Sequence, residues 1–404
     1  MNKLKFWIIV IIFPLLACNE YIKVLPGSYI GNLYTSDNQA IPFNLYLLSD
    51  GSVQIYNDKE IVDMEKIIYE EDSFIIKSSV FEGYIKAKSS KEGINGYFTN
   101  NSLDRKIKFT ANNGTERFKI KNYKTVNDFS GKWKVVFNPG EVEEYNAIGI
   151  FDQNGSKISG TFRTTTGDYG FMEGISEANS VMMSTFNGAR SYLFKGNLEN
   201  DNITGYFYRG NYNKIPFKAS RDEEFSLPNP NSLTVMSDSN SNKFKFSFKD
   251  SRGVLVSDSD SIFDNKVVVI QIMGTWCPNC LDETAFISDF IKKNNYKDLR
   301  FVSLAFEYAK TKQKAIENIN KLEKKFNIKY PILLAQYGTS NKVEAQKKLP
   351  SLNQVISYPT LIFIDRNKNV RRIHTGFNGP ATGKKYQKFK NEFKNLVIKL
   401  IEED

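Results

Sequence analysis

A strand predicted for the middle of a sheet runs directly into two closely spaced cysteines. Residues 266–273 read Lys-Val-Val-Val-Ile-Gln-Ile-Met, an apolar run typical of a strand that is buried on both faces. It is followed at once by Gly274-Thr275-Trp276-Cys277-Pro278-Asn279-Cys280, and Leu281–Lys293 then shows the apolar spacing of a helix. The cysteines are therefore predicted at a strand-to-helix junction, in a sheet flanked by helices.

This position suits thiol chemistry, because attack on a disulfide requires a thiolate. Cys277 would face unpaired backbone N–H groups and the positive end of the helix dipole, and both stabilise the anion. Cys280 lies one helical turn further on the same face, from where it can resolve a mixed disulfide formed by Cys277. Pro278 fits the first helical turn, where its missing N–H has no helical partner.

The small number of cysteines and histidines limits the chemistry. The chain has 404 residues, three cysteines and one histidine, His374. This set cannot assemble a His/Cys zinc cluster, and no second cysteine pair exists that could complete a zinc site with Cys277 and Cys280. We therefore expect no metal and no cofactor.

The N-terminus combines a positive start with a short apolar run that ends at a cysteine. Lys3 and Lys5 precede the apolar residues 6–17, which are too few to span a bilayer comfortably and fit a secretory signal. The ending Leu-Leu-Ala-Cys at Cys18 resembles the lipobox of bacterial lipoproteins. The resemblance implies removal of residues 1–17 and acylation of Cys18, and several acyl chains would give a stable tether to the membrane.

A plain signal or an uncleaved anchor is the alternative for this segment, and either one still exports the chain. We expect a cell-envelope lipoprotein that faces the periplasm, on the inner or the outer membrane. If Cys18 carries lipid, Cys277 and Cys280 are the remaining pair. Two cysteines so close together cannot staple a fold, which points to a redox-active pair.

The long segment before this domain reads as strands and contains a repeat. Short alternating runs in residues 25–221 are separated by Gly, Asn, Asp and Ser turns, with hairpin signals at Asp50-Gly51 and Asn154-Gly155. Three motifs recur in order: Gly27-Ser28-Tyr29 with Gly131-Lys132-Trp133, Ile94-Asn95-Gly96-Tyr97-Phe98 with Ile203-Thr204-Gly205-Tyr206-Phe207, and Lys106-Ile107-Lys108-Phe109 with Lys214-Ile215-Pro216-Phe217.

Each copy could supply roughly eight short strands, enough to close a small barrel. The Gly-x-Trp motif that opens the second copy resembles the start of lipocalin-like barrels. A single sixteen-stranded body and two sandwiches are the alternatives. The expected organisation is a signal peptide 1–17, β repeats 18–113 and 114–225, a Pro-, Asn- and Ser-rich linker 226–243, and an α/β domain 244–404.

The last domain continues with alternating strand and helix candidates. These are strands at 299–305, 330–335, 357–365 and 370–375, and helices at 313–326 and 384–401. With these elements, residues 244–404 resemble the TlpA/ResA-like branch of the thioredoxin superfamily. The resemblance rests on Trp276-Cys277-Pro278-Asn279-Cys280 and Tyr358-Pro359-Thr360.

The resemblance implies a thioredoxin fold with a cis peptide bond before Pro359. It also implies a substrate groove beside the cysteines, shaped by Trp276, Pro278, Tyr358, Pro359 and Thr360.

Two further positions bear on proton transfer. Glu283 matches an acidic position that tunes the cysteines in that branch, and an exposed acid in the first helical turn is the alternative. Gln271 stands where thioredoxins proper carry a buried aspartate. Because glutamine cannot titrate, proton transfer is expected to fall to Glu283, to water or to the substrate.

The resemblance implies a membrane-tethered thiol–disulfide oxidoreductase. Its expected partners are disulfide-containing exported proteins, a membrane dithiol that donates electrons, and the membrane itself through Cys18. The resemblance favours the reducing direction, in which Cys277 attacks disulfides of exported proteins and Cys280 resolves, although the residues alone do not fix the direction because it depends on relative thiolate stabilities. The net charge of +10 comes from lysines interleaved with acids, and no nucleic-acid partner is expected.

Two other functions are compatible with parts of the sequence. A thiol peroxidase would share the fold, but its Pro-x-x-x-Thr-x-x-Cys signature does not precede Cys277. A lipoprotein binding module would use the β repeats to capture a ligand or partner, with the last domain serving only for docking.

Overall fold

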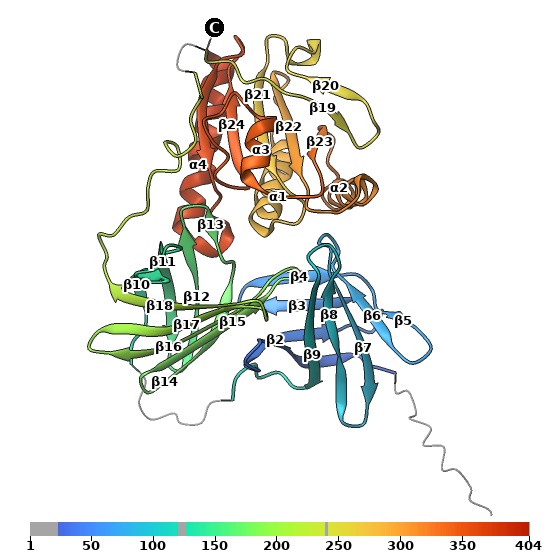
Figure 1. Ribbon diagram of the computed structural model, residues 1–404, viewed down its shortest axis with the longest axis vertical. Coiled ribbons are helices and arrows are strands. Elements are labelled where there is room, and N and C mark those ends of the chain that lie inside the picture. Colours follow the sequence, from blue (N-terminus) through green and yellow to red (C-terminus); the bar gives the residue numbers. More distant parts are fainter. Residues whose placement is uncertain (1–22, 120–126, 239–240, 404) are drawn as a thin grey trace, which may run out of the picture.

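The computed structural model describes residues 23–119, 127–238 and 241–403, which form two barrel-like β sheets and an α/β domain (Figure 1). The two sheets lie side by side below the α/β domain in this view. Cys18 and the predicted signal peptide lie outside the described residues. Among the helices of the described residues, none is both long and apolar enough to cross a membrane.

The first sheet is an antiparallel meander of nine strands that curls back on itself, and we call it the open barrel. β1 pairs with β9 along one seam, whereas the opposite seam has a single bridge from Met64, at the end of β4, to Ser78. Its strands are β1 (Gly27–Tyr34), β2 (Ala40–Leu47), β3 (Val53–Asn57), β4 (Glu60–Met64), β5 (Ile68–Tyr69), β6 (Phe74–Lys77), β7 (Tyr84–Ser90), β8 (Gly93–Asn100) and β9 (Arg105–Asn113).

The second sheet closes completely, and we call it the closed barrel. Pairing of β10 with β18 and of β11 with β12 completes a ring of eight strands, to which the two-residue β13 is added beside β12. Its strands are β10 (Gly131–Phe137), β11 (Tyr145–Asn154), β12 (Lys157–Thr164), β13 (Gly167–Asp168), β14 (Met172–Glu177), β15 (Ser180–Phe186), β16 (Ser191–Glu199), β17 (Asn202–Arg209) and β18 (Asn213–Arg221).

The predicted all-β region with two barrel-like repeats is confirmed. The three repeated motifs fall on equivalent strands, namely β1 and β10, β8 and β17, and β9 and β18. The opening aromatic residues also make equivalent bonds, because Tyr29 Oη donates to the Leu25 carbonyl and Trp133 Nε1 donates to the Phe129 carbonyl. Inward-facing aromatic rings fill the closed barrel, including Trp133.

The two barrels differ in how they complete their cores. Phe186, Leu193 and Tyr208 of the closed barrel belong to the hydrophobic core of the open barrel. The ring centroid of Phe186 lies 4.8 Å from that of Phe43 and 5.2 Å from that of Phe98. The open barrel therefore uses its neighbour to cover apolar residues that its weakly joined seam leaves accessible.

The α/β domain contains a seven-stranded sheet in the order β20-β19-β23-β22-β21-β24-β25, in which β21, β22 and β23 run parallel. Its main elements are β19 (Ser247–Asp250), β20 (Leu255–Ser257), β21 (Val267–Met273), α1 (Pro278–Lys293), β22 (Leu299–Phe306), α2 (Lys312–Phe326), β23 (Ile332–Gln336), α3 (Lys342–Lys348), β24 (Thr360–Ile364), β25 (Val370–Thr375) and α4 (Lys384–Glu402).

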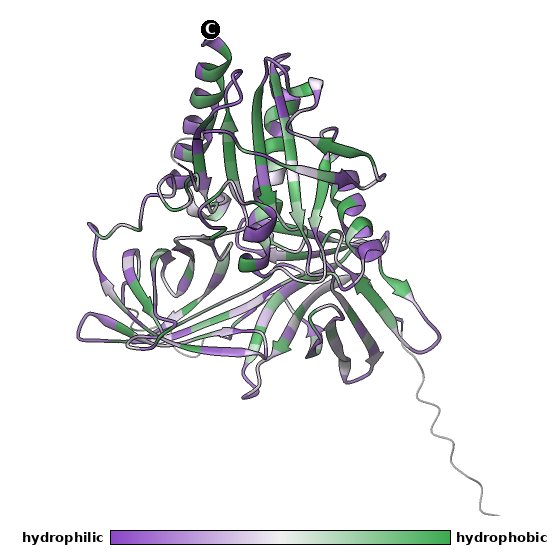
Figure 2. Cartoon of the chain, turned by 45° about the horizontal axis from the view of Figure 1, so that its top comes forward, coloured by the Kyte–Doolittle hydropathy of each residue, from purple (hydrophilic) through white to green (hydrophobic). Residues whose placement is uncertain are grey.

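β21 is buried along its whole length, as its apolar run predicts. Val267 and Val269 pack in a core with α1 and α4, while Val268, Ile270 and Ile272 pack in a second core with α2. Figure 2 shows hydrophobic residues running through the central strands and alternating with hydrophilic ones along α4. The predicted thioredoxin-like fold of this domain is confirmed.

Three short elements of this domain were not predicted. β19 and β20 form a hairpin at the sheet edge, and α3 is a seven-residue helix capped by Asn341, whose side chain accepts bonds from the N–H groups of Val343 and Glu344. These segments are too short for a clear apolar periodicity, so tertiary contacts and the cap determine their structure.

Candidate active site

Cys277 is the N-cap residue of α1, at the predicted junction with β21. Its sulfur accepts a hydrogen bond from the Cys280 N–H at 3.3 Å, and Pro278 occupies the first helical turn. A side chain at Gly274 would lie 2.3 Å from Trp276 Nε1 and 2.9 Å from the Phe306 carbonyl oxygen, so only glycine fits this turn. The start of α1 at Pro278 and the tight turn at Gly274 together place the Cys277 sulfur at the N-terminus of the helix.

The surroundings of Cys277 favour its thiolate. Burial alone raises the pKa of this thiol, but the bond with Cys280, the charge of Arg190 and the backbone N–H groups of Cys280 and Asn279 outweigh it. The net pKa of Cys277 is therefore lowered. Burial and the neighbouring Cys277 raise the pKa of Cys280 well above its usual value. The two free cysteines are thus distinguished as a more acidic attacking thiol and a protonated partner.

The predicted groove residues gather around Cys277. The Tyr358–Pro359 peptide bond is cis, as predicted, and the Tyr358 carbonyl oxygen lies 3.3 Å from the Cys277 sulfur. Thr360 Oγ1 donates to the Ser357 carbonyl and holds this loop at the start of β24.

Trp276, next to Cys277 in the chain, is half-buried. Its Nε1 donates to the Phe306 carbonyl at 2.9 Å, and its ring packs edge-on against Tyr358. The Trp276 ring is therefore fixed beside the Pro359 loop.

Glu283 is fully buried next to the cysteines, so the alternative of an exposed helix acid is wrong. Gln271 Nε2 donates to its Oε2 at 2.9 Å, while Oε1 has no hydrogen-bond partner among the described residues. Burial raises the pKa of Glu283 well above its usual value, and the charge of Cys277 raises it further. A protonated carboxyl group in this position can give a proton to a nearby thiolate, and once ionised it can take one from a thiol.

Glu307 is a second buried carboxyl group, which the sequence reasoning missed. It accepts hydrogen bonds of 2.7 Å from both the N–H and the hydroxyl of Thr275, two residues before Cys277. Burial raises its pKa to about 7. A signal was present, since Glu307 lies just after the apolar strand predicted at 299–305, which the structure extends to Phe306 and pairs in parallel with β21.

The barrels cover the reactive sulfur. Cys277 is only 5% exposed, and Val80 of the open barrel belongs to the same hydrophobic cluster as Cys277. Arg190, in the turn between β15 and β16, lies close enough for its charge to act on Cys277. The tip between β12 and β13 reaches the α/β domain in Figure 1. None of these contacts was predicted from the sequence.

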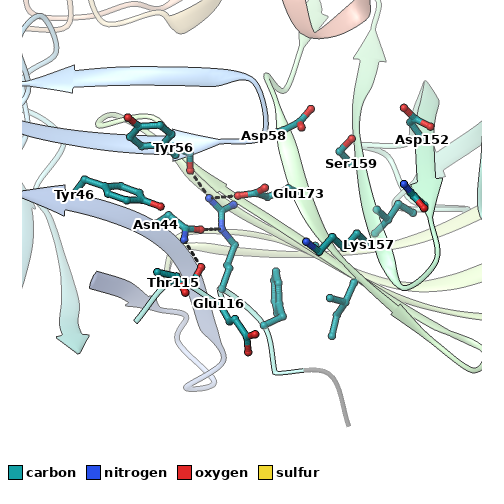
Figure 3. A pocket seen from close by; sticks show the side chains of 16 residues that line it. Asn44, Tyr46, Tyr56, Asp58, Thr115, Glu116, Asp152, Lys157, Ser159 and Glu173 are labelled. Atoms are coloured by element: carbon teal, nitrogen blue, oxygen red, sulfur yellow. Dashed lines mark hydrogen bonds and ion pairs between the residues drawn. The ribbon is translucent and has the colours of Figure 1, made fainter. Parts of the chain in front are cut away.

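A pocket of about 470 Å³ lies where the two barrels meet (Figure 3). Arg117 crosses this junction and donates to Asn44 of the open barrel and to the Ser184 carbonyl of the closed barrel, both at 2.9 Å. It also pairs with Glu173 at 2.8 Å. Because the guanidinium is already partnered by protein groups, we interpret Arg117 as a structural link between the barrels.

His374 is buried on β25, where its Nδ1 lies 2.8 Å from Asn231 Oδ1. Within the ranges that the structure describes, no group of three or more His, Cys, Asp or Glu side chains is arranged to hold a metal ion.

A comparison with protein-family models gives a match that covers most of the α/β domain. Residues 239–388, less than half of the chain, match the Redoxin family model. No curated protein matches the chain. The fold assignment rests on the strand order described above and on this Redoxin match.

Several solved structures are similar to part of the chain. A thiol:disulfide interchange protein of the thioredoxin family from Chlorobium tepidum is 19% identical, with 40% of this chain and 96% of that chain covered and a TM-score of 0.30. A secreted disulfide oxidoreductase from Mycobacterium tuberculosis is 17% identical, with 38% and 96% covered and a TM-score of 0.28. A thiol-disulfide oxidoreductase from Bacteroides fragilis is 16% identical, with 36% and 96% covered and a TM-score of 0.27.

Proposed function

We propose that this protein is an exported, membrane-tethered thiol–disulfide oxidoreductase that reduces disulfides of other exported proteins. The observation that supports it most is the Cys277 sulfur at the N-terminus of α1, bonded to the Cys280 N–H and beside the Tyr358 carbonyl. A helix N-terminus stabilises a thiolate there, and the thiolate is the attacking species in disulfide exchange.

The proposed reaction transfers two electrons in two exchanges. The Cys277 thiolate attacks one sulfur of the substrate disulfide, forms a mixed disulfide and releases the other substrate sulfur as a thiolate, which takes up a proton. Cys280 loses its proton and attacks the Cys277 sulfur. A Cys277–Cys280 disulfide forms, and the second substrate sulfur leaves and is protonated.

Once it has given its own proton to the substrate thiolate released in the first exchange, Glu283 is the proposed proton acceptor for the resolving step. The Cys280 thiol has a raised pKa, so it needs a base when it attacks. The Oε1 atom of Glu283 is buried and unbonded among the described residues, and the Glu283 carboxyl acts electrostatically on both cysteines. Gln271 holds the other oxygen of Glu283 and cannot itself titrate.

The cellular setting is part of the same proposal. The lipobox-like sequence at Cys18 supports export, acylation and attachment to a membrane with the α/β domain facing the periplasm. Each turnover leaves a Cys277–Cys280 disulfide, so continued reduction requires a dithiol donor. We propose a membrane dithiol as this donor.

Insulin reduction with dithiothreitol as the donor tests the activity. The parent protein should accelerate insulin reduction well above the uncatalysed rate, and Cys277→Ser should return it to that rate. In the absence of dithiothreitol, reduced Cys280→Ser should instead accumulate a mixed disulfide with insulin on Cys277, which mass spectrometry of the trapped species detects.

The proposed substrate class, disulfide-containing exported proteins, is tested by a separate experiment. Trapping with Cys280→Ser in an envelope preparation should recover exported proteins that contain disulfides. Turnover by Cys277→Ser at the parent's rate would exclude the activity, whereas an active protein that traps no exported protein would exclude this substrate class.

A further inference from the structure

The contact between the closed barrel and the α/β domain lies on the rim of the cysteine site. Its central part is the tip that connects β12 to β13, Thr164–Asp168, which we call the capping hairpin. Cys277 is only 5% exposed in this arrangement. A thiol that attacks disulfides in other proteins must be reachable, so the described arrangement has to change before a protein substrate can react.

The capping hairpin contacts the α/β domain mainly through its backbone. Gly167 forms a parallel β-bridge with Phe377. Ser357 Oγ donates to the Thr166 carbonyl at 3.1 Å. The Asp168 carboxylate accepts a bond from the Gly379 N–H. An extended segment of another chain could make the first two contacts, since they use no side chain of the hairpin.

The partners of the capping hairpin surround Cys277. Ser357 is followed by Tyr358, whose carbonyl oxygen lies 3.3 Å from the sulfur. The Phe377 carbonyl accepts from Asn279, which lies between the two cysteines, at 3.3 Å. The Gly376 N–H donates to the Pro359 carbonyl at 2.9 Å. The capping hairpin therefore rests on two loops that frame the reactive sulfur, the one before β24 and the one after β25.

We propose that the capping hairpin occupies the surface on which an extended segment of the substrate protein docks, and that the substrate must displace it before Cys277 attacks. This inference rests on the proposed function and adds to it a built-in competitor for the substrate. The barrel pair then acts as a selective cover, because only polypeptides that make the same backbone contacts can replace the hairpin.

The remaining contacts permit such a displacement. On the open-barrel side, Val80 packs in the hydrophobic cluster of Cys277, and the other contacts are polar, with Asn100 Nδ2 donating to Tyr308 Oη at 3.0 Å and Glu65 pairing with Lys321 at 3.5 Å. Asp168 of the closed barrel and Asp282 of α1 both lie close to Gly379, and burial together with the charge of Asp168 raises the pKa of Asp282 well above its usual value. Burying two carboxyl groups in this contact costs free energy, and contacts with many polar groups separate more easily than purely apolar ones.

Gly167 provides the variant that tests this inference. Its φ is +147°, and a Cβ there would lie 1.8 Å from Asn279 Nδ2 and 2.9 Å from the Phe377 carbonyl oxygen. Gly167→Val therefore cannot keep the docked arrangement. Gly170→Ala is the matched control, because Gly170 also has a positive φ, +73°, but its Cβ would have no atom within 4 Å.

The experiment follows oxidation of the reduced full chain by insulin and by hydroxyethyl disulfide. Gly167→Val should raise the rate with insulin about ten-fold, as expected when a mostly occluded state becomes open. The gain with the small disulfide should be clearly smaller, and Gly170→Ala should stay within about two-fold of the parent with both reagents.

Hydrogen exchange at Gly379 reports undocking independently of the chemistry, because Asp168 accepts from this N–H. Faster exchange in Gly167→Val, with insulin oxidised no faster than by the parent, would overturn the inference. Unchanged exchange would overturn it too, since the hairpin would then not protect this amide. Asp168→Ala replaces Gly167→Val if the latter does not fold.

The rates with insulin and with the small disulfide distinguish a failure of the proposed oxidoreductase function from a failure of the proposed capping role. If neither parent nor variants react with insulin or the small disulfide, the proposed function fails. If the parent reacts with both and undocking brings no gain with insulin, the proposed function stands and the capping role alone is rejected.

Discussion

The barrel pair and the α/β domain differ in where they bury polar groups. In the α/β domain, Glu283 and Glu307 are fully buried inside the domain, next to the cysteine turn. In the barrels, the buried charges described above lie at contacts between units: Arg117 joins the two barrels, and Asp168 meets the α/β domain. Burying a carboxyl group costs free energy unless it is well partnered.

The difference indicates a division of labour. The α/β domain retains buried carboxyl groups beside Cys277, where pKa values are shifted, as is typical of reaction centres. The barrels are filled by aromatic and aliphatic side chains and use their polar groups for assembly. A packed interior leaves the closed barrel suited to covering a partner surface rather than to enclosing a ligand.

Among the variants that test this difference between the barrel pair and the α/β domain, Phe186→Ala is expected to have the largest effect. Phe186→Ala should destabilise the barrel pair by about 3–5 kcal/mol, because a large side chain is lost from a core that both barrels share. Hydrogen exchange measured by mass spectrometry should accelerate in β1–β9 and in β10–β18. The exposed Tyr337→Ala is the control and should change little. A response confined to β10–β18 would show that the barrels fold separately.

A smaller effect is expected at Glu307, and it depends on pH. The pKa of Glu307 is raised to about 7 in the folded protein from an ordinary value of 4.5. The contribution of Glu307 to the free energy of unfolding is therefore largest below pH 4.5. It falls by about 3 kcal/mol as the pH rises through about 7, because the folded protein then has to bury a charged carboxylate. Glu307→Gln imitates the neutral carboxyl and should remove this dependence.

Denaturant unfolding of parent and variant at pH 5 and pH 8 measures the difference for Glu307. Glu317→Gln changes an exposed carboxyl on α2 and should leave the parent's pH dependence in place. If Glu307→Gln keeps the full loss of stability between the two pH values, the carboxyl is not the titrating group.

The smallest effect is expected from Arg190, a closed-barrel residue whose charge acts on Cys277 of the α/β domain. Arg190→Gln should raise the pKa of Cys277, because one positive charge near the thiolate is removed. The pH dependence of alkylation by iodoacetamide gives this pKa, and Arg190→Lys should retain most of the parent's value. An unchanged pKa in Arg190→Gln would mean that the α/β domain alone sets the acidity of Cys277.

Local patterns predicted much of the α/β domain. The apolar run 266–273, Pro278 and the cysteine spacing identified the junction between β21 and α1, since these features depend on neighbours in the sequence. The barrel-like repeats were also predicted, from alternating runs and three recurring motifs. The lipid attachment at Cys18 remains a prediction.

The contacts between units could not be predicted in the same way. Asp168 and Gly379, or Arg190 and Cys277, are far apart in the chain and share no periodicity that links them. The core shared by the two barrels was also unforeseen, because it depends on Phe186 of one repeat packing among apolar residues of the other. Packing between domains is a property of surfaces, and the sequence pattern of either surface alone does not specify its partner.

The position of the capping hairpin within a ring of paired strands has a kinetic consequence. A competitor that is covalently part of the same molecule cannot diffuse away, and its effective concentration at the groove is on the order of millimolar whatever the protein concentration. Diluting the protein will not free the groove. A folded substrate protein at low concentration would rarely displace the hairpin, whereas an unfolded chain, which offers many extended segments, would displace it more often.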